Sequence, residues 1–107
     1  MQHLSASELA AWIADPARPT PFLLDVREPW EFETCRIDGA VSLPMRSIPA
    51  RLSELHEDAP LVCICHHGAR SMQVAHFLEQ HGFQEVANLT GGVDAWARQV
   101  DPTMPIY

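Results

Sequence analysis

The residues whose types could do chemistry together lie in one segment, which reads Cys65-His66-His67-Gly68-Ala69-Arg70-Ser71. An apolar run precedes the segment and a helical pattern follows it, so Cys65 is expected to end a strand and face a helix N-terminus. The first amides of a helix have no partner within it, and with the helix dipole they favour an anion at the sulfur. Gly68 permits a tight turn, and Arg70 offers a planar guanidinium that suits an oxyanion. The segment predicts a nucleophilic thiolate that faces a cradle for an anionic group.

Short apolar runs alternate with helical patterns along the rest of the chain. The apolar runs predict strands over residues 22–26, 39–43, 61–65 and 85–89. The helical patterns predict helices after the capping-box sequence Ser5-Ala6-Ser7-Glu8, over residues 29–34, 46–55 and 69–80, and after Gly91-Gly92. This alternation is typical of an α/β fold with a mainly parallel sheet and helices on both faces. Sites in such sheets form beyond the carboxyl ends of the strands, where Cys65 is expected.

Composition restricts the classes of function. The 107 residues predict a single domain over residues 1–107. The chain has no lysine, which excludes a Schiff-base lysine, a P-loop lysine and a Ser–Lys dyad. The net charge of −7 argues against nucleic acid and against an anionic membrane surface as partners. We expect no cofactor.

The cysteine count and the first residues bear on the compartment. Three cysteines cannot all pair, and free thiols are typical of a reducing compartment. The first residues lack the basic and apolar regions of a secretory signal. We therefore expect a cytoplasmic protein, with a monomer as the default oligomeric state.

Four sequence blocks resemble those of one known family, the rhodanese-like domains, which are sulfurtransferases. Cys65, Gly68 and Arg70 match the family motif Cys-x-x-Gly-x-Arg, and Ser71 follows as it often does. The other blocks occur in family order: Asp25-Val26-Arg27-Glu28 with Glu31-Phe32, Ile37-Asp38-Gly39-Ala40 with Leu43-Pro44, and Leu89-Thr90-Gly91-Gly92-Val93 with Ala95-Trp96. The resemblance extends over residues 22–97.

The resemblance implies a three-layer rhodanese-like fold with about five strands, and it implies a mechanism. The Cys65 thiolate would take a sulfane sulfur from a small anionic donor such as thiosulfate and become a persulfide. Cyanide, a thiol or a protein thiol would then accept the outer sulfur. The substrate-binding residues would be His66, His67, Gly68, Ala69, Arg70 and Ser71. By analogy, Arg70 would orient the donor or brace the loop.

Three other functions are weighed against sulfur transfer. Related folds that act as dual-specificity phosphatases or arsenate reductases have one more residue between cysteine and arginine, whereas four residues separate Cys65 from Arg70. Metal binding by Cys63, Cys65, His66 and His67 fits zinc spacing poorly, so no metal is predicted. A non-enzymatic module for protein interaction or redox sensing would be expected to lack the cysteine.

Other polar residues lie in the loop or beside it. His66 and His67 either tune the thiolate and attract an anionic donor or are exposed loop residues without a special role. Asp25 and Arg27 are expected to support the site through an ion pair, and Glu31 to join the same polar cluster.

The two other cysteines are expected to take no part in the reaction. Cys63, two residues before Cys65 on the predicted strand, is expected to be buried and inert. Cys35 stands where the family has Gly before His, and a role as a second sulfur carrier is an alternative that a Cys35→Ser substitution tests.

Overall fold

A computed structural model describes residues 1–107. All five strands belong to one parallel sheet, in the order β1-β5-β4-β2-β3. The strands are β1 (Gln2–Leu4), β2 (Phe22–Asp25), β3 (Val41–Ser42), β4 (Leu61–Ile64) and β5 (Val86–Leu89). The α-helices are α1 (Ala6–Ala14), α2 (Pro29–Thr34), α3 (Ala69–Gln80) and α4 (Gly92–Gln99), and the 3₁₀ helices are η1 (Met45–Ser47) and η2 (Pro49–Glu54). The predicted α/β class with a mainly parallel sheet is confirmed.

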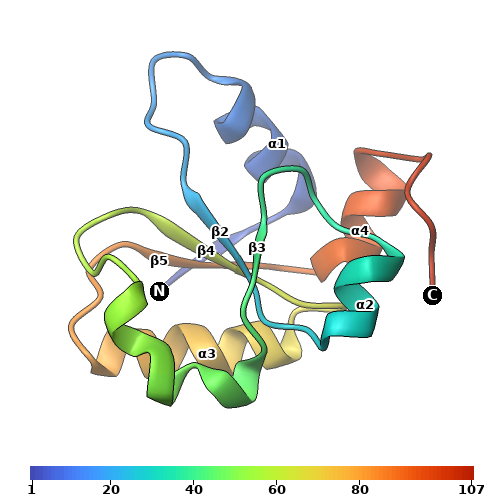
Figure 1. Cartoon of the computed structure of the whole chain (residues 1–107). Coiled ribbons are helices and arrows are strands. Elements are labelled where there is room, and N and C mark those ends of the chain that lie inside the picture. Colours follow the sequence, from blue (N-terminus) through green and yellow to red (C-terminus); the bar gives the residue numbers. More distant parts are fainter.

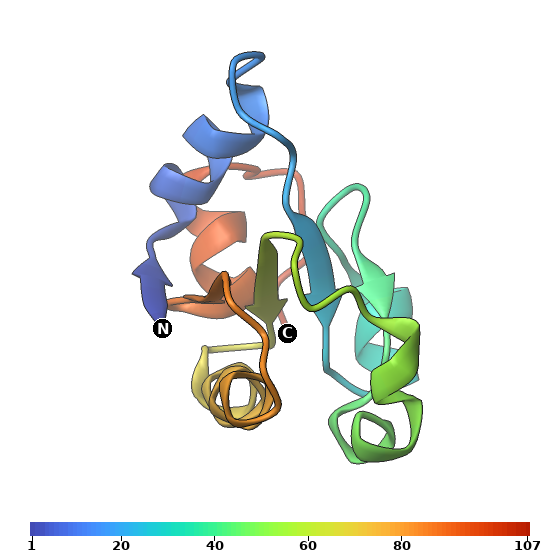
Figure 2. The ribbon, with the colours of Figure 1, turned by 90° about the vertical axis from the view of Figure 1, so that its left-hand side faces the viewer.

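Helices cover both faces of the sheet (Figures 1 and 2). Helices α1 and α4 pack on one face around the buried side chains of Leu9, Val62 and Trp96. Helix α3 and the 3₁₀ helices cover the other face, where Ile48, Cys63 and Leu78 are buried. None of the helices has the length and apolar character that crossing a membrane requires.

Local signals explain where the helices begin. Ser5 Oγ accepts from the amide of Glu8 at 3.1 Å, and Glu8 Oε1 accepts from the amide of Ser5 at 2.9 Å, which is the predicted capping box. Helix α2 begins at Pro29, whose fixed φ suits a first helical residue and whose missing N–H costs nothing there. The predicted bounds of α2 and α3 agree with the structure.

Three elements differ from the sequence prediction. The expected strand over residues 39–43 is shorter in the structure: β3 is limited to Val41–Ser42, and Gly39 turns with φ +85° ahead of it. The expected helix over residues 46–55 is two 3₁₀ segments, since Pro49 has no amide to continue a helix across the junction. Strand β1 was not predicted, and it pairs with β5 along three residues at the edge of the sheet.

Sheet register places the two functional segments side by side. Asp25 at the end of β2 pairs with Ile64 at the end of β4. The chain therefore leaves both strands at the same carboxyl edge, and the segment after Asp25 runs next to the loop after Ile64.

Candidate active site

Cys65 lies one residue beyond β4, and its sulfur faces the N-terminus of α3. The amide of Gly68 donates to Sγ at 3.1 Å, and the amide of Ser71 donates at 3.3 Å. The cysteine is only 1 % exposed, so bulk water cannot replace these donors. Two amides and the positive end of a twelve-residue helix thus converge on one sulfur, an arrangement that stabilises negative charge there.

The tight loop depends on the conformation of Gly68. Its φ is +105°, a region that side chains disfavour, and it is the residue that precedes α3. A Cβ at this position would lie 3.2 Å from the amide nitrogen of Gly91 and 3.3 Å from the carbonyl oxygen of Leu89. Glycine is therefore required both for the turn and for the close approach of the neighbouring backbone.

Asn88 on β5 holds the Cys65 loop through two hydrogen bonds and was not identified from the sequence. Its Nδ2 donates to the carbonyl of Gly68 at 3.1 Å, and its Oδ1 accepts from Ser71 Oγ. Ser71 Oγ also lies 3.3 Å from Cys65 Sγ. Because the single hydroxyl hydrogen of Ser71 is directed at Asn88, the Cys65 thiol donates to Ser71 Oγ when it is protonated. A buried asparagine within an apolar strand was the available signal.

Helix α4 presses against the other side of the loop. The amides of Val93 and Asp94 donate to the carbonyls of Cys65 and His66 at 2.9 and 3.1 Å. A Cβ on Gly92 would lie 2.3 Å from the Cys65 carbonyl oxygen and 2.4 Å from that of His66. The block Leu89-Thr90-Gly91-Gly92-Val93 therefore belongs to the site. Its Gly92 lets the start of α4 approach the peptide that joins Cys65 to His66.

Arg70 is held by Glu31 in a two-bonded ion pair. Its Nη1 and Nη2 donate to the two Glu31 carboxylate oxygens at 2.7 and 2.9 Å. The Arg70 hydrogen bonds lower the pKa of Glu31 to about 2, so the carboxylate stays charged at neutral pH. The Arg70 side chain is still 38 % exposed. This geometry fixes Arg70 to the segment that carries Glu31 and leaves part of its guanidinium open to solvent.

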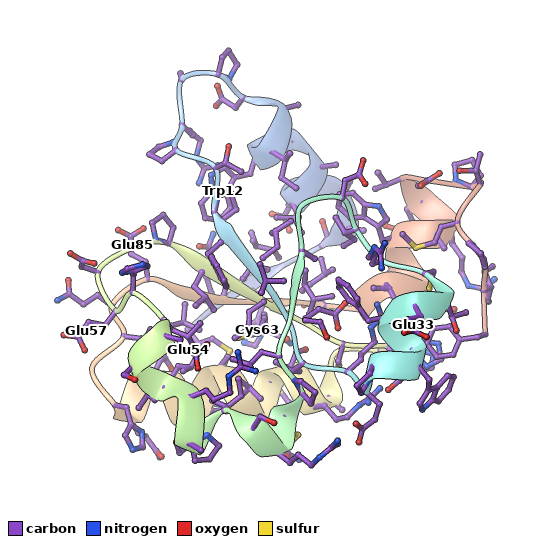
Figure 3. All side chains as sticks on the ribbon, viewed as in Figure 1. Trp12, Glu33, Glu54, Glu57, Cys63 and Glu85 are labelled. Atoms are coloured by element: carbon purple, nitrogen blue, oxygen red, sulfur yellow. The ribbon has the colours of Figure 1, made fainter.

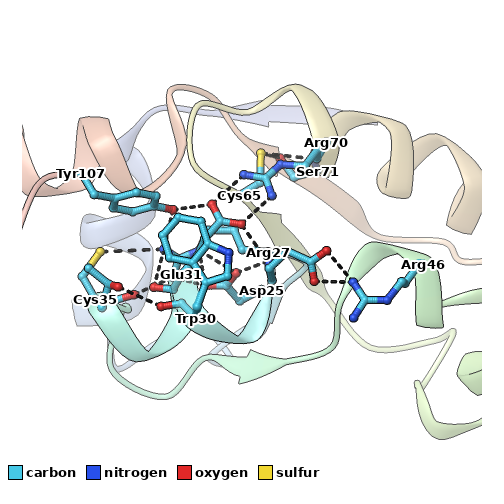
Figure 4. A network of polar contacts seen from close by, with 12 residues as sticks. Asp25, Arg27, Trp30, Glu31, Cys35, Arg46, Cys65, Arg70, Ser71 and Tyr107 are labelled. Carbon is cyan, nitrogen blue, oxygen red and sulfur yellow. Dashed lines mark hydrogen bonds and ion pairs between the residues drawn. The ribbon is translucent and has the colours of Figure 1, made fainter.

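Asp25 and Arg27 form a second, fully buried pair beneath the first (Figure 4). The Arg27 guanidinium also donates to the carbonyls of Cys35 at 2.6 Å and Glu31 at 3.2 Å, and to Tyr107 Oη at 2.9 Å. Burial opposes the charge of Arg27, but the hydrogen bonds to Asp25 and Tyr107 raise its pKa. Both side chains are buried, and Arg27 bonds to the carbonyls at Glu31 and Cys35, so the pair supports the segment that carries Glu31.

The two loop histidines differ in their surroundings. His66 is partly buried and stacks on Tyr107, with ring centroids 4.0 Å apart and planes 9° from parallel. Its Nε2 is buried without a partner, and burial lowers the pKa of His66. His67 is exposed, and its ring centroid lies 3.9 Å from that of His66. Ala69 is exposed at the first position of α3.

Side chains of the types that bind metals also gather near the loop. The ligand atoms of His66, His67 and Asp94 lie within 4.8 Å of one another. Asp94 is already paired with Arg98 at 3.0 Å. Neither Cys63 nor Cys65 belongs to this group, so the four-residue set considered from the sequence does not assemble around one point.

The other two cysteines have different surroundings. Cys63 is fully buried within β4 on the face that α3 covers (Figure 3), and burial raises its pKa. Cys35 is buried on the opposite face, with its sulfur 3.8 Å from Nη1 of Arg27. All three thiols are unpaired.

Comparisons with known proteins agree with this geometry. The sequence profile of the rhodanese-like domain matches residues 5–99. A sulfurtransferase of Allochromatium vinosum is 46 % identical over 76 residues, which are 71 % of each chain. The rhodanese-like/PpiC domain-containing protein 12 of Arabidopsis thaliana chloroplasts is 36 % identical over 112 residues, and the match covers all of this chain but 38 % of that protein.

A solved structure extends the likeness to the fold. The rhodanese-like domain protein of Staphylococcus aureus superposes with a TM-score of 0.84 at 28 % identity, covering 100 % of this chain and 99 % of that one. The relatives' names support sulfur transfer as the general class of reaction. The fold, the Cys65 loop and the profile match over 5–99 together establish that the chain belongs to the rhodanese-like domain family.

Proposed function

We propose that the protein transfers a sulfane sulfur from a small anionic donor such as thiosulfate to a thiophilic acceptor, through a persulfide on Cys65. The observation that carries the proposal is the pair of amides, from Gly68 and Ser71, that donate to the Cys65 sulfur at 3.1 and 3.3 Å. Donors fixed in place before the reaction stabilise a charged sulfur without reorganising. The reaction would follow a double-displacement scheme.

In the first step the Cys65 thiolate attacks the sulfane sulfur of thiosulfate. The new bond joins Sγ to that sulfur, the bond between the sulfane sulfur and the sulfonate sulfur breaks, and sulfite leaves with the electron pair. The persulfide keeps a negative charge on its outer sulfur. The amides at the start of α3 and the helix dipole would stabilise this charge.

In the second step an acceptor attacks the outer sulfur. With cyanide, a carbon–sulfur bond forms, the bond between Sγ and the outer sulfur breaks, and thiocyanate leaves. With a thiolate acceptor the product is that thiol's persulfide. Cys65 recovers its thiolate in either case, so no external oxidant or reductant is needed.

The charge of the chain bears on how the donor is recruited. A net charge of −7 repels an anion at long range, and the chain has no lysine to offset it. Attraction must therefore be local, and the exposed part of the Arg70 guanidinium and the helix-terminal amides provide it. The same acidic surface favours a basic protein as the thiol acceptor. The chain spans 38 % of the length of the Arabidopsis relative. Any partner of such a longer protein would be a separate proposal for this chain.

The proposal is tested by intact-mass measurement after incubation with thiosulfate and, separately, with 3-mercaptopyruvate. We expect wild-type protein to gain one sulfur atom and to lose it on addition of cyanide. Cys65→Ser should gain none. Cys35→Ser and Cys63→Ala are matched controls that remove the other thiols and should gain sulfur as the wild type does.

Two results would contradict the proposal. One is a sulfur adduct that persists in Cys65→Ser, which would place the carrier elsewhere. The other is no adduct from either donor together with turnover of an aryl phosphate, which would favour the phosphatase alternative.

A further inference from the structure

Tyr107 contacts the ion pair on one flank of the Cys65 loop. Its hydroxyl donates to Glu31 Oε2 at 2.7 Å and accepts from Arg27 Nη1 at 2.9 Å (Figure 4). Glu31 in turn holds the Arg70 guanidinium. One hydroxyl therefore joins the buried pair beneath the site to the pair that fixes Arg70, although 76 residues separate Tyr107 from Glu31.

The ring of Tyr107 contacts the other flank. It stacks face to face on His66, the residue directly after Cys65, with ring centroids 4.0 Å apart. Trp30 packs against Tyr107 in a T-shaped arrangement, with ring centroids 5.7 Å apart. A single side chain thus touches the chain where the loop begins and, through Glu31, the arginine where the loop runs into α3.

The protonation states make the hydroxyl contact durable. Burial raises the pKa of Tyr107 to about 12, while the Arg70 hydrogen bonds lower the pKa of Glu31 to about 2. The phenol is therefore protonated and the carboxylate ionised across the range in which enzymes are assayed. The hydroxyl donates to Glu31 throughout that range and accepts from Arg27 through its free lone pair.

We propose that Tyr107 is a positioning residue for the sulfur transfer suggested above, with its ring holding His66 and its hydroxyl holding Glu31 so that Arg70 stays in place. The inference rests on the proposed function, because positioning is defined by the reaction it serves. A residue that only anchored the segment after α4 would change stability alone. A positioning residue also changes the rate at temperatures where every variant is folded.

Three variants separate these roles. Tyr107→Phe keeps the ring and removes the hydroxyl, whereas Tyr107→Ala removes both. Ile106→Ala is the matched control, since Ile106 lies next to Tyr107 in the chain and is 54 % exposed. Each variant is measured by thermal unfolding, by thiosulfate–cyanide kinetics well below the unfolding temperature, and by NMR titration of His66.

We expect Tyr107→Phe to lower kcat/KM about tenfold, because an ionised acceptor loses a donor and Arg70 loosens. Its His66 titration should match the wild type. Tyr107→Ala should lower kcat/KM further and raise the pKa of His66 toward its ordinary value, because the stacked ring is part of what buries it. Other groups that face His66 are the same in all variants: His67, Arg70, Glu31 and Asp94.

Wild-type kcat/KM in Tyr107→Phe would overturn the inference, and so would an equal loss in Ile106→Ala. An unchanged His66 titration in Tyr107→Ala would overturn the role of the ring. The His66 titration needs no sulfur donor. If wild-type protein took up no sulfur, the proposed function would fail while this titration still showed whether the Tyr107 ring holds His66.

Discussion

Cys63 and Cys65 are two residues apart, equally buried at 0 % and 1 % exposure, and part of the same apolar cluster, yet their surroundings differ in kind. Cys63 lies inside β4, where the neighbouring amides are engaged in the sheet, and burial raises its pKa. Cys65 lies just past the strand, where two amides point at its sulfur. Burial alone makes a thiol inert, whereas burial beneath oriented donors prepares a nucleophile.

The sharpest test of this comparison removes each sulfur in turn. Cys65→Ala should lower kcat/KM for thiosulfate by about a thousandfold or more, because no other group replaces the nucleophile. Cys63→Ala should keep activity close to wild type and lose about 1 kcal/mol of unfolding free energy, for the small cavity it leaves. Steady-state kinetics and urea unfolding measure both. A large loss of activity in folded Cys63→Ala would contradict the distinction.

The next test of the comparison alters the turn at Gly68, which directs two amides at the Cys65 sulfur. Gly68→Ala should lower kcat/KM about a hundredfold, since a Cβ there meets the backbone of Gly91 and Leu89 and moves an amide from the sulfur. Gly39→Ala is the matched control, because Gly39 also has a positive φ but no atom lies within 4 Å of its Cβ position. Both variants should lose about 1–3 kcal/mol of stability from backbone strain, and Gly39→Ala should keep its activity. Equal activity in the two variants would show that the turn does not aim the amides.

Asn88 should have a smaller effect, because it acts on Cys65 through the loop. Asn88→Ala removes the donor to the Gly68 carbonyl and the acceptor of the Ser71 hydroxyl, and should lower kcat/KM about tenfold. Ser71→Ala and the double variant complete a mutant cycle. We expect the double variant to lose less than the two single losses combined, since both side chains support the same contacts. Independent, multiplicative losses would separate Asn88 from the Cys65 cradle.

The ion pair of Glu31 and Arg70 holds Arg70 directly, so its loss should lower kcat/KM about as much as Tyr107→Phe does, and its remaining and smallest effect is on stability. The pKa of Glu31 falls from 4.5 to about 2 on folding, so its contribution is complete above pH 4.5 and is lost as pH falls toward 2. Solvent screening at half-exposed Arg70 reduces that contribution to about 1–2 kcal/mol.

Glu31→Gln should therefore lower the unfolding free energy at pH 7 and flatten its decline in acid. Urea unfolding across this pH range measures the effect. Glu54→Gln, which breaks the exposed pair with Arg51, is the control and should change nothing measurable. A wild-type acid profile in Glu31→Gln would contradict the role given to the pair.

Local sequence signals were sufficient for much of the fold. Pro29 at the start of α2 and Gly68 before α3 mark helix starts that depend on single residues, and both bounds were predicted correctly. Strand β1 was missed because it has three residues, of which only Leu4 is buried, so no alternation is visible. Residues 46–55 carry a helical pattern, but Pro49 divides it into tighter 3₁₀ segments.

The candidate site likewise has parts that the sequence predicted and parts that it did not. The Cys65 loop is contiguous, so its residue types and spacing were visible in the sequence and carried the family resemblance. Asn88 bonds to Gly68 from 20 residues away, and Tyr107 bonds to Glu31 from 76 residues away, and no local pattern reports such contacts. The pairing of Arg70 with Glu31 was likewise hidden, although Glu31 was expected in the polar cluster.

The contact between Gly92 and the peptide after Cys65 has a consequence for how the protein can change. Because α4 touches the carbonyls of Cys65 and His66 with no room for a methyl group, that side of the loop cannot widen without moving a whole helix. A longer loop, able to enclose a bulkier tetrahedral anion, would need a second, compensating change in the helix. The length of the loop between Cys65 and Arg70 is thus coupled to Gly92, more than twenty residues further along the chain, and an insertion in the loop alone should destabilise the protein.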